Sequence, residues 1–213
     1  LVTAGPTYEP IDPLRFIGNW STGKMGFAAA KASSQRGADV ILISGPTSLE
    51  TPKNVKRIDV ITSDEMFNEV VRFYDEVDVV IMASAVADYS PVQKFERKLK
   101  KEDIKGDFVE LKLKKTKDIL KYLGEHKKGQ ILVGFALETE NAIENAKQKL
   151  EQKNLDFIVL NTLGEGSGFG YDTNIVTIIS KNGEIFELPK MSKYEVANKI
   201  LDIVSAKLKN GKK

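Results

Sequence analysis

Short apolar, β-branched runs alternate with amphipathic stretches along most of this 213-residue chain. Several runs are almost wholly apolar, as in Val77-Asp-Val-Val-Ile-Met-Ala83. Such runs are typical of strands covered on both faces, as in a parallel sheet. We expect strands at residues 1–4, 39–44, 55–60, 77–83, 130–135 and 157–160. The alternation predicts an α/β fold, a Rossmann-like doubly wound sheet that is mostly parallel.

The amphipathic stretches predict helices at residues 25–36, 64–74, 117–123, 142–152 and 193–208. Thr62 and Glu65 form a capping-box pattern before the second helix. Gly37 follows the first helix, as a C-terminal cap should. Residues 174–180 and 185–188 flank Asn182-Gly183, which predicts an added antiparallel C-terminal hairpin. Because no repeat or linker is visible, we expect one domain over residues 1–213.

The composition excludes several kinds of chemistry. The chain has no cysteine, which excludes disulfides, thiolate zinc sites, iron–sulfur clusters and cysteine nucleophiles. Its single histidine, His126, lies in a polar run where a turn is expected, which argues against histidine metal clusters and a Ser-His-Asp triad. No apolar run reaches about 18 residues and no signal peptide is visible. We therefore expect a cytoplasmic protein without membrane contact. The start at Leu1 suggests a piece of a longer polypeptide or a processed start.

Positive charge is concentrated in one segment. Residues 94–117 hold ten Lys or Arg and five Asp or Glu, a net charge of +5, whereas the whole chain carries +2. The part from 108 to 114 alternates like an exposed strand, and the part before it predicts a flexible loop. A basic loop beside an α/β sheet is a candidate lid over an anionic ligand. The alternative is a solvated lysine face.

The stretch Gly18-Asn-Trp-Ser-Thr-Gly-Lys-Met25 comes close to a phosphate-binding loop. Met25 replaces the hydroxyl residue that would hold magnesium, and the preceding residues contain two prolines and do not resemble a buried strand. A glycine-containing loop that opens a helix can still bind an anion through free N–H groups. The alternative is a turn that only lets the helix pack closely.

Further candidates lie where predicted strands end, which is where open α/β sheets bind ligands. Asp88 could accept hydrogen bonds from ligand hydroxyls or help to hold a metal ion, or it could belong to a packed strand exit. Phe135 could stack on a base or belong to the core. Lys149 and Lys153 share one helix face, where two like charges are costly unless an anion lies between them. The glycine-rich stretch 164–170 predicts a flexible loop and is weak support for a site.

Together these features favour a nucleotide or another polyphosphate ligand. Three other classes remain open at this point. A P-loop-like NTPase would have Ser or Thr at position 25. An NAD(P)-dependent reductase would have G-x-G-x-x-G after the first strand, where Gly5-Pro-Thr-Tyr8 stands. A nucleic-acid-binding module is disfavoured by the low net charge and by the lack of aromatic residues within 98–105.

The combination of motifs resembles one family closely. The opening Thr3-Ala-Gly-Pro-Thr-Tyr-Glu-Pro-Ile-Asp-Pro-Leu-Arg-Phe-Ile-Gly-Asn-Trp-Ser-Thr-Gly-Lys-Met-Gly26 resembles that of bacterial phosphopantothenate–cysteine ligases. Ala85-Val-Ala-Asp-Tyr89, Lys98-Leu-Lys-Lys101, Gly134-Phe-Ala-Leu-Glu-Thr139 and Lys153-Asn-Leu-Asp156 are similar to its later motifs, in the same order. The resemblance covers essentially the whole chain.

The resemblance implies a ligase of coenzyme A biosynthesis that joins 4'-phosphopantothenate to L-cysteine. In that family the substrate carboxylate attacks the α-phosphate of CTP, which gives an acyl-cytidylate and pyrophosphate. The cysteine amine then displaces CMP. Both nucleophiles belong to substrates, so a chain without cysteine suits this chemistry, which needs positioning and charge neutralisation. Mg²⁺ bridging the CTP phosphates is expected, with protein ligands left open.

The resemblance also implies roles for single residues. Asn19, Lys98 and Arg15 match catalytic positions, with Asn19 and Arg15 near the acyl-cytidylate. Lys98 opens the Lys-x-Lys-Lys motif of a flexible flap at about 94–107. Substrate or intermediate binding is expected at Ser84, Ala85, Gly23 and Lys24, and CTP binding at Asp88, Lys98, Lys117, Asp118, Ile119, Leu120, Phe135, Lys149 and Lys153. Ser84 replaces a usual alanine, and Lys117 replaces a frequent proline, so only its backbone role carries over.

The same resemblance implies partners. We expect a homodimer in which the second subunit helps to complete the site. In a full-length protein we expect fusion to an N-terminal FMN-dependent phosphopantothenoylcysteine decarboxylase domain, which would explain the start at Leu1. No nucleic-acid partner is expected.

Overall fold

The structure is a computed structural model that describes residues 1–103, 107–138, 140–161, 168 and 170–211. Its centre is an eight-stranded sheet with the order β12-β11-β10-β9-β6-β1-β4-β5. Six of these strands are parallel: β1 (Val2–Ala4), β4 (Val40–Ser44), β5 (Val55–Asp59), β6 (Val79–Met82), β9 (Ile131–Leu137) and β10 (Phe157–Asn161). The predicted Rossmann-like, mostly parallel sheet is confirmed.

Both faces of this sheet are buried, which explains the continuous apolar runs. Neighbouring residues of one strand enter opposite core clusters, as Leu132 and Val133 do in β9. The face that includes Val133 is covered by α1 (Lys24–Gln35) and α5 (Lys193–Gly211). The face that includes Leu132 is covered by α2 (Ser63–Tyr74), α3 (Ile119–Glu125) and α4 (Ala142–Gln152). In the part of the chain described, no helix is both long and apolar enough to cross a membrane.

The antiparallel C-terminal hairpin is also confirmed. β11 (Thr173–Ser180) pairs with β10 on one side and with β12 (Ile185–Ser192) on the other. Gly183 in the connecting turn has φ +87°, which an L side chain rarely adopts. β12 runs past the predicted end at residue 188 and includes Pro189, which is tolerated because β12 is an edge strand.

The predicted helix ends are mostly found. Thr62 and Glu65 form the capping box of α2, with Thr62 Oγ1 accepting from the Glu65 amide at 3.2 Å. Gly37, with φ +83°, ends α1 by donating to Ser34 O at 3.0 Å. The prediction that a helix starts at residue 117 is wrong by two residues. Asp118 is the N-cap of α3, because its carboxylate accepts from the Lys121 amide at 3.0 Å.

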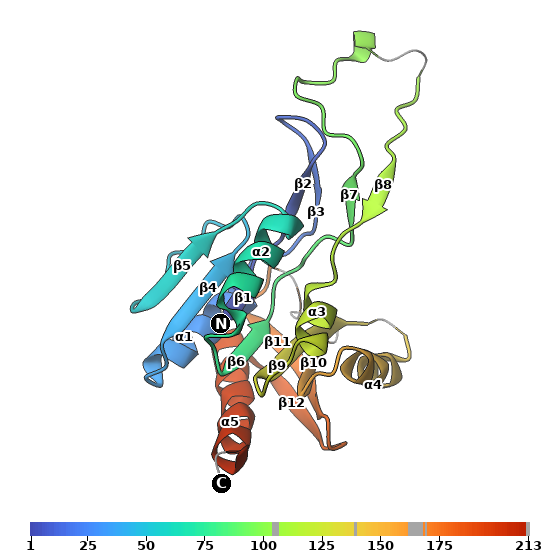
Figure 1. The fold of residues 1–213 in the computed structure, drawn as a ribbon. Helices are drawn as coiled ribbons and strands as arrows, with labels where there is room; N and C mark the ends of the chain where they lie inside the picture. Colours follow the sequence, from blue (N-terminus) through green and yellow to red (C-terminus); the bar gives the residue numbers. More distant parts are fainter. Residues whose placement is uncertain (104–106, 139, 162–167, 169, 212–213) are drawn as a thin grey trace.

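A slender arm rises from the carboxyl edge of the sheet (Figure 1). It consists of two hairpins and the described residues between their strands: β2 (Tyr8–Pro10) with β3 (Phe16–Gly18), and β7 (Tyr89–Pro91) with β8 (Leu113–Lys115). The 3-10 turn Lys101–Asp103 lies between β7 and β8. The expected strand over residues 108–114 is largely wrong, since only the last two of these residues belong to β8. Its partner β7 is three residues long and ends at Pro91, which has no N–H to donate.

Candidate functional site

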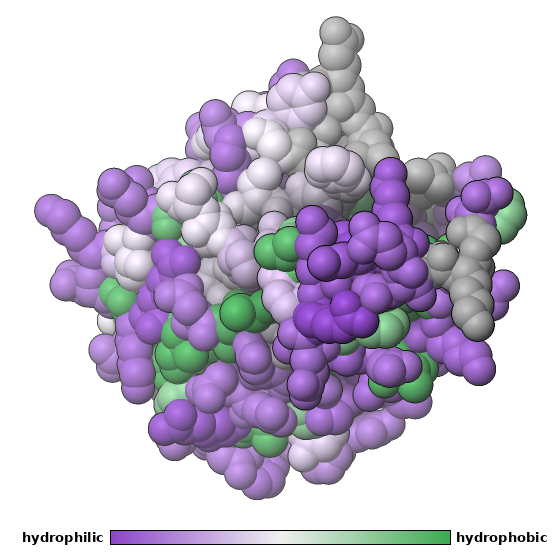
Figure 2. All heavy atoms as spheres, turned by 90° about the horizontal axis from the view of Figure 1, so that it is seen from above, coloured by the Kyte–Doolittle hydropathy of each residue, from purple (hydrophilic) through white to green (hydrophobic). Residues whose placement is uncertain are grey.

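Two neighbouring cavities lie at the carboxyl edge of the sheet, between the arm and the helices. They share the residues that follow β6 and those at the end of β9, namely Ser84, Ala85 and Phe135 with Ala136 and Leu137. Viewed from the arm side, the molecular surface is mainly hydrophilic, with small apolar areas between charged side chains (Figure 2). This edge is where an open α/β sheet is expected to bind a ligand.

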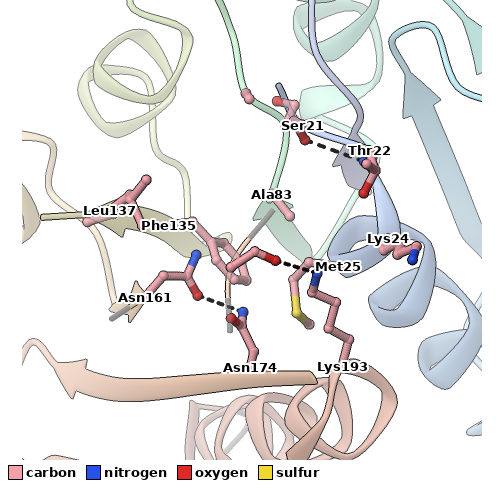
Figure 3. A pocket seen from close by; sticks show the side chains of 15 residues that line it. Ser21, Thr22, Lys24, Met25, Ala83, Phe135, Leu137, Asn161, Asn174 and Lys193 are labelled. Carbon is pink, nitrogen blue, oxygen red and sulfur yellow. Dashed lines mark hydrogen bonds between the residues drawn. The ribbon is translucent and has the colours of Figure 1, made fainter. Parts of the chain in front are cut away.

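The smaller cavity lies against the N-terminus of α1 (Figure 3) and has a volume of about 180 Å³. Gly23 is the N-cap in a left-handed conformation, with φ +81°. No side chain caps this end of α1, and its first turn carries no acidic residue. The first amide groups of α1 and the positive end of its dipole are therefore available to an anion. Ser21, Thr22, Lys24 and Met25 also line this cavity.

The two interpretations of this loop are compatible. A Cβ added at Gly26 would lie 2.5 Å from Ala4 Cβ and 2.6 Å from Thr3 O. Gly26 therefore lets α1 pack directly on β1, as the packing interpretation requires. That close contact also brings Gly23 and Lys24 to the wall of the cavity, as the anion interpretation requires.

The floor of the smaller cavity is polar. Asn174 Nδ2 donates to Asn161 Oδ1 at 2.9 Å, and Lys193 Nζ donates to Tyr171 O at 2.5 Å and to Gly168 O at 3.0 Å. Lys193 is 7% exposed, and burial together with the nearby charge of Lys24 lowers its pKa. Lys24 in turn donates to Gly170 O and pairs with Asp172, both at 2.8 Å. Its hydrogen bond to Asp172 lowers the pKa of that carboxyl.

The larger cavity is an open cleft of about 730 Å³ between α3, α4 and the exit of β6. This volume lies in the range of small-molecule and cofactor sites. Eleven residues with an expected ligand role line it: Asn19, Ser84, Ala85, Asp88, Lys117, Asp118, Ile119, Leu120, Phe135, Lys149 and Lys153. Residues from five separate parts of the sequence therefore meet in one cleft.

Lys149 and Lys153 each have a carboxylate partner within the chain. Lys149 Nζ lies 2.5 Å from Glu138 Oε1, and its hydrogen bond lowers the pKa of Glu138. Lys153 Nζ lies 3.0 Å from Asp118 Oδ2. The repulsion between the two lysines is therefore offset within the chain, because each ammonium group has its own carboxylate partner. Both lysines still line the cleft.

Lys117 turns its side chain towards α2. Its Nζ lies 3.1 Å from Asp64 Oδ1 and 4.6 Å from the centroid of the Phe67 ring. These contacts agree with the expectation that only its backbone matters to the site. Phe135 is half-buried, packs against one core cluster and lines both cavities, so its two interpretations hold together.

Asn19 connects the end of the β2–β3 hairpin to the exit of β6. Its Nδ2 donates to Ala85 O at 3.1 Å and lies 3.4 Å from Val86 O. The same exit loop is held by backbone bonds to Gly5 and Thr7, and Thr116 Oγ1 donates to Ala87 O at 2.6 Å. Ser84 Oγ accepts from Thr3 Oγ1 at 2.8 Å, so its oxygen has a partner inside the fold.

Arg15 and Lys98 lie on the arm and line neither cavity. Arg15 Nε donates to Asp12 Oδ2 at 2.9 Å, and its Nη2 donates to Leu99 O at 2.6 Å. Lys98 is exposed. Residues 104–106 of the expected flap lie outside the described residues, as do residues 164–167 and 169 of the glycine-rich stretch and Thr139 of the strand-exit motif.

A family model described as the DNA/pantothenate metabolism flavoprotein C-terminal domain matches residues 1–208. The chain belongs to this family. It is 53% identical over 208 residues to the coenzyme A biosynthesis bifunctional protein CoaBC of Bacillus subtilis (strain 168), a match that covers 97% of this chain and 50% of that protein. It is 46% identical over 203 residues to a cysteine/cysteine sulfinic acid decarboxylase from an unknown prokaryotic organism, covering 94% of this chain and 56% of that one.

A solved structure agrees with this family assignment. The crystal structure of the C-terminal domain of a coenzyme A biosynthesis bifunctional protein CoaBC is 45% identical, has a TM-score of 0.83, and is matched over 98% of this chain and 94% of that one. The chain spans about half the length of the curated relatives that it matches. The family resemblance noted in the sequence is confirmed.

Several polar lining residues were not among the predicted site residues, including Thr116, Asn161, Asn174 and Lys193. Asn161 ends a buried strand, so the rule that selected Asp88 could have found it. Lys193 had no sequence signal, because a lysine at the start of an amphipathic helix is normally exposed.

A metal site made by the protein alone is absent from the described part of this family member. No group of three or more His, Asp or Glu side chains there could hold a metal ion. Asp118 and Glu138 near the cleft are each paired with a lysine. This donor set suits Mg²⁺ only in its usual nucleotide-bound form, in which water and phosphate oxygens supply most of the ligands.

Proposed function

We propose that this chain is a CTP-dependent phosphopantothenate–cysteine ligase that acts in coenzyme A biosynthesis. One observation carries the proposal. Apart from Lys98 on the arm, the positions to which the resemblance assigns CTP line a single cleft of nucleotide size: Asp88, 117–120, Phe135, Lys149 and Lys153. Family membership and the similarity to CoaBC support the same activity.

The proposed reaction has two steps. A carboxylate oxygen of 4'-phosphopantothenate attacks the α-phosphorus of CTP, the bond to the β-phosphate oxygen breaks, and pyrophosphate leaves. The amine of L-cysteine then attacks the acyl carbon of the acyl-cytidylate, the bond to the CMP oxygen breaks, and the amine loses a proton. The protein contributes orientation and positive charge rather than a nucleophile.

The cleft has groups for each part of the nucleotide. Phe135 offers a ring against which a base can stack. Asp88 is exposed at the cleft and can accept hydrogen bonds from hydroxyl groups. Lys149 and Lys153 supply positive charge, and the backbone of 117–120 contributes polar groups around the start of α3. The neighbouring N-terminus of α1, with Gly23 and Lys24, favours a phosphate group of a substrate or of the intermediate.

Three residues are proposed to act on the reacting atoms or to control access to them. Asn19, at the boundary of the cleft with the arm, contacts the acyl-cytidylate and favours its conversion to the amide. Lys98 on the arm promotes formation of the intermediate, and Arg15 supports the same stage. Mg²⁺, held mainly through CTP phosphates, neutralises charge that develops on the triphosphate.

The partners of the chain are also proposals. They are 4'-phosphopantothenate, L-cysteine and CTP as substrates, a second copy of the chain as subunit, and an upstream FMN-dependent decarboxylase domain in the full-length protein. The match to about half of a bifunctional protein supports the fusion.

The decisive test is an assay of the complete reaction. The protein is incubated with Mg²⁺, 4'-phosphopantothenate, L-cysteine and either CTP or ATP, and pyrophosphate, nucleoside monophosphate and the amide product are measured. We expect CMP and amide in equal amounts with CTP, and much less product with ATP. Nucleotide hydrolysis without 4'-phosphopantothenate would favour an NTPase and contradict the proposal.

Two lysines of α4 provide a matched pair of variants. Lys149→Met removes a charge that lines the cleft, whereas Lys147→Met removes one that does not line it. We expect the Kd for CTP to rise about tenfold in Lys149→Met, which corresponds to one charge-assisted contact, and to change less than twofold in Lys147→Met. Equal changes in the Kd for CTP in both variants would contradict CTP binding in this cleft.

A further inference from the structure

Asp12 is a buried carboxylate in the turn between β2 and β3, outside both cavities. It is 2% exposed although it lies on the thin arm. One oxygen accepts from the amides of Leu14 and Arg15, both at 2.9 Å, which closes the hairpin turn. The other oxygen accepts from the guanidinium of Arg15 and from the amide of Leu99 at 3.1 Å.

These bonds join two parts of the arm that are more than 80 residues apart in sequence. Leu99 donates its N–H to Asp12 and accepts at its C=O from Arg15 at 2.6 Å. Both backbone groups of one residue are therefore held by a single ion pair. A further bond from the Phe95 amide to Ile11 O, at 2.9 Å, joins the same two strips. We call Asp12, Arg15 and Leu99 the clasp.

The chemistry of the clasp gives it a fixed geometry. Hydrogen bonds from Arg15, followed by those from backbone amides, hold the pKa of Asp12 well below its ordinary value, so the carboxylate stays ionised at neutral pH. A planar guanidinium that donates to a carboxylate and a carbonyl has few alternative arrangements. On the other side of Leu99, Asp103 accepts from the guanidinium of Arg97 and from the Lys100 amide.

Lys98 lies between two held residues, Arg97, which is bonded to Asp103, and Leu99, which is bonded to Asp12 and Arg15. We propose that Asp12 and Arg15 are positioning residues, which fix the backbone at Leu99 and so hold Lys98 in place for the first chemical step. The role of Lys98 rests on the proposed function, whereas the clasp itself does not. Arg15 then acts through the arm and not by touching the acyl-cytidylate.

The first test measures, without any ligand, how well the clasp protects the arm from cleavage by trypsin. The arm carries trypsin sites at Lys94, Arg97, Lys98, Lys100 and Lys101, and cleavage there is followed by mass spectrometry. We expect cleavage about fivefold or more faster in Asp12→Asn, in Arg15→Gln and in the double variant. Asp202→Asn on α5, which removes an exposed ion pair with Arg36, is the control, and trypsin should cleave its arm at the wild-type rate. Wild-type rates in both clasp variants would overturn the clasp.

The second test is a double-mutant cycle on pyrophosphate release in a single turnover with CTP and 4'-phosphopantothenate. If Asp12 and Arg15 act as a unit, each single variant and the double variant lose about the same activity, about tenfold or more, because misplacement of a catalytic group is costly even from a distance. In a Lys98→Gln background, Asp12→Asn should cause no further loss. Arg15→Lys, which keeps the charge but not the fork, should behave like Arg15→Gln.

The outcomes separate the two proposals. A much larger loss in Arg15→Gln than in Asp12→Asn, with additive effects, would assign Arg15 to the substrate and overturn its positioning role. Faster cleavage with unchanged pyrophosphate release would overturn the link to Lys98. Absence of CTP turnover in the wild-type protein would reject the proposed ligase, while the cleavage rates would still report on the clasp. If Asp12→Asn loses the circular dichroism signal of the folded protein, the cleavage rate and pyrophosphate release are measured on Arg15→Lys instead.

Discussion

At the scale of single residues, the side chain of Asn19 acts as a hydrogen-bond donor to the backbone. Its amide nitrogen faces the carbonyl oxygens of Ala85 and Val86. An aspartate at this position would place a carboxylate against those oxygens with no proton to donate, which costs more than the loss of a hydrogen bond. The exit loop of β6 would then lose its bond to Asn19 and keep only its other bonds, to Gly5, Thr7 and Thr116.

We predict that Asn19→Asp forms acyl-cytidylate but converts it to the amide at least a hundredfold more slowly. Rapid quenching followed by chromatography of the intermediate measures both stages. Asn198→Asp on α5, far from the cleft in sequence and outside both cavities, is the matched control and should turn over normally. Normal turnover by Asn19→Asp would reject the proposed role.

Gly26 gives a second prediction at this scale. Because a Cβ there would lie 2.6 Å from Thr3 O, Gly26→Ala must push α1 away from β1. We expect a loss of about 2 kcal/mol in the free energy of unfolding, as for an overpacked core, together with weaker nucleotide binding. Gly37→Ala, with open space but φ +83°, should cost about 1 kcal/mol and leave binding unchanged. Urea unfolding and CTP titration distinguish the two effects.

At the scale of elements, Asp156, directly before β10, joins three other parts of the chain at the opposite end of the sheet. Its carboxylate accepts from Lys127 before β9, from the Leu132 amide in β9 and from Lys207 of α5. Burial acts to raise the pKa of Asp156, but these hydrogen bonds together outweigh burial and lower it. The ionised form is therefore the one that the fold stabilises.

The sign of the pH dependence follows from that direction. Stability supplied by Asp156 is fully present above its unfolded-state pKa, about 3.9, and is lost as the pH falls through that value towards the lower folded-state pKa. We predict that Asp156→Asn costs about 3 kcal/mol at pH 7 and reduces the further loss on acidification to pH 3. Asp75→Asn, from an exposed pair with Lys128, should change unfolding by less than about 0.5 kcal/mol. Equal acid sensitivity of wild type and Asp156→Asn would contradict this account.

The elements of the central sheet could be predicted because their signals are local. A strand buried on both faces has an apolar run, and a capped helix has its cap residue in the sequence. The arm could not be predicted in this way. Its hairpins are three-residue strands with Pro10 and Pro91, and they are held by contacts such as Asp12 with Leu99 across 87 residues. The burial of Lys193 could not be predicted either, because it also depends on contacts between residues far apart in sequence, here with the β10–β11 connection.

At the scale of the whole molecule, apolar exposure is concentrated on and beside the arm. Eight of the fourteen large apolar side chains that are exposed in the described residues are Leu14, Phe16, Trp20, Tyr89, Val92, Phe108, Val109 and Leu113. Trp20 is 91% exposed and Phe108 85%. Exposed apolar residues gathered in one region are typical of a protein interface. This distribution supports the proposed homodimer.

We predict a dimer by light scattering, and a shift to monomer when Trp20 and Phe108 are both replaced by serine. Ile185→Ser, which removes a comparable exposed side chain from β12, is the control and should stay dimeric. A strict monomer with full ligase activity would contradict the expectation of a shared site.

The packing of α5 on α1 has a consequence for the order of folding. Arg36 at the end of α1 bonds to Asn198 and Asp202, at separations of 162 and 166 residues. The connection between β4 and β5 contains no helix, so that face of the first half of the sheet is completed only by α5. During synthesis, the apolar side of β1, β4 and α1 therefore stays uncovered until residues 193–204 have been made. We expect a chaperone that binds apolar surface to remain on this part of the chain longest.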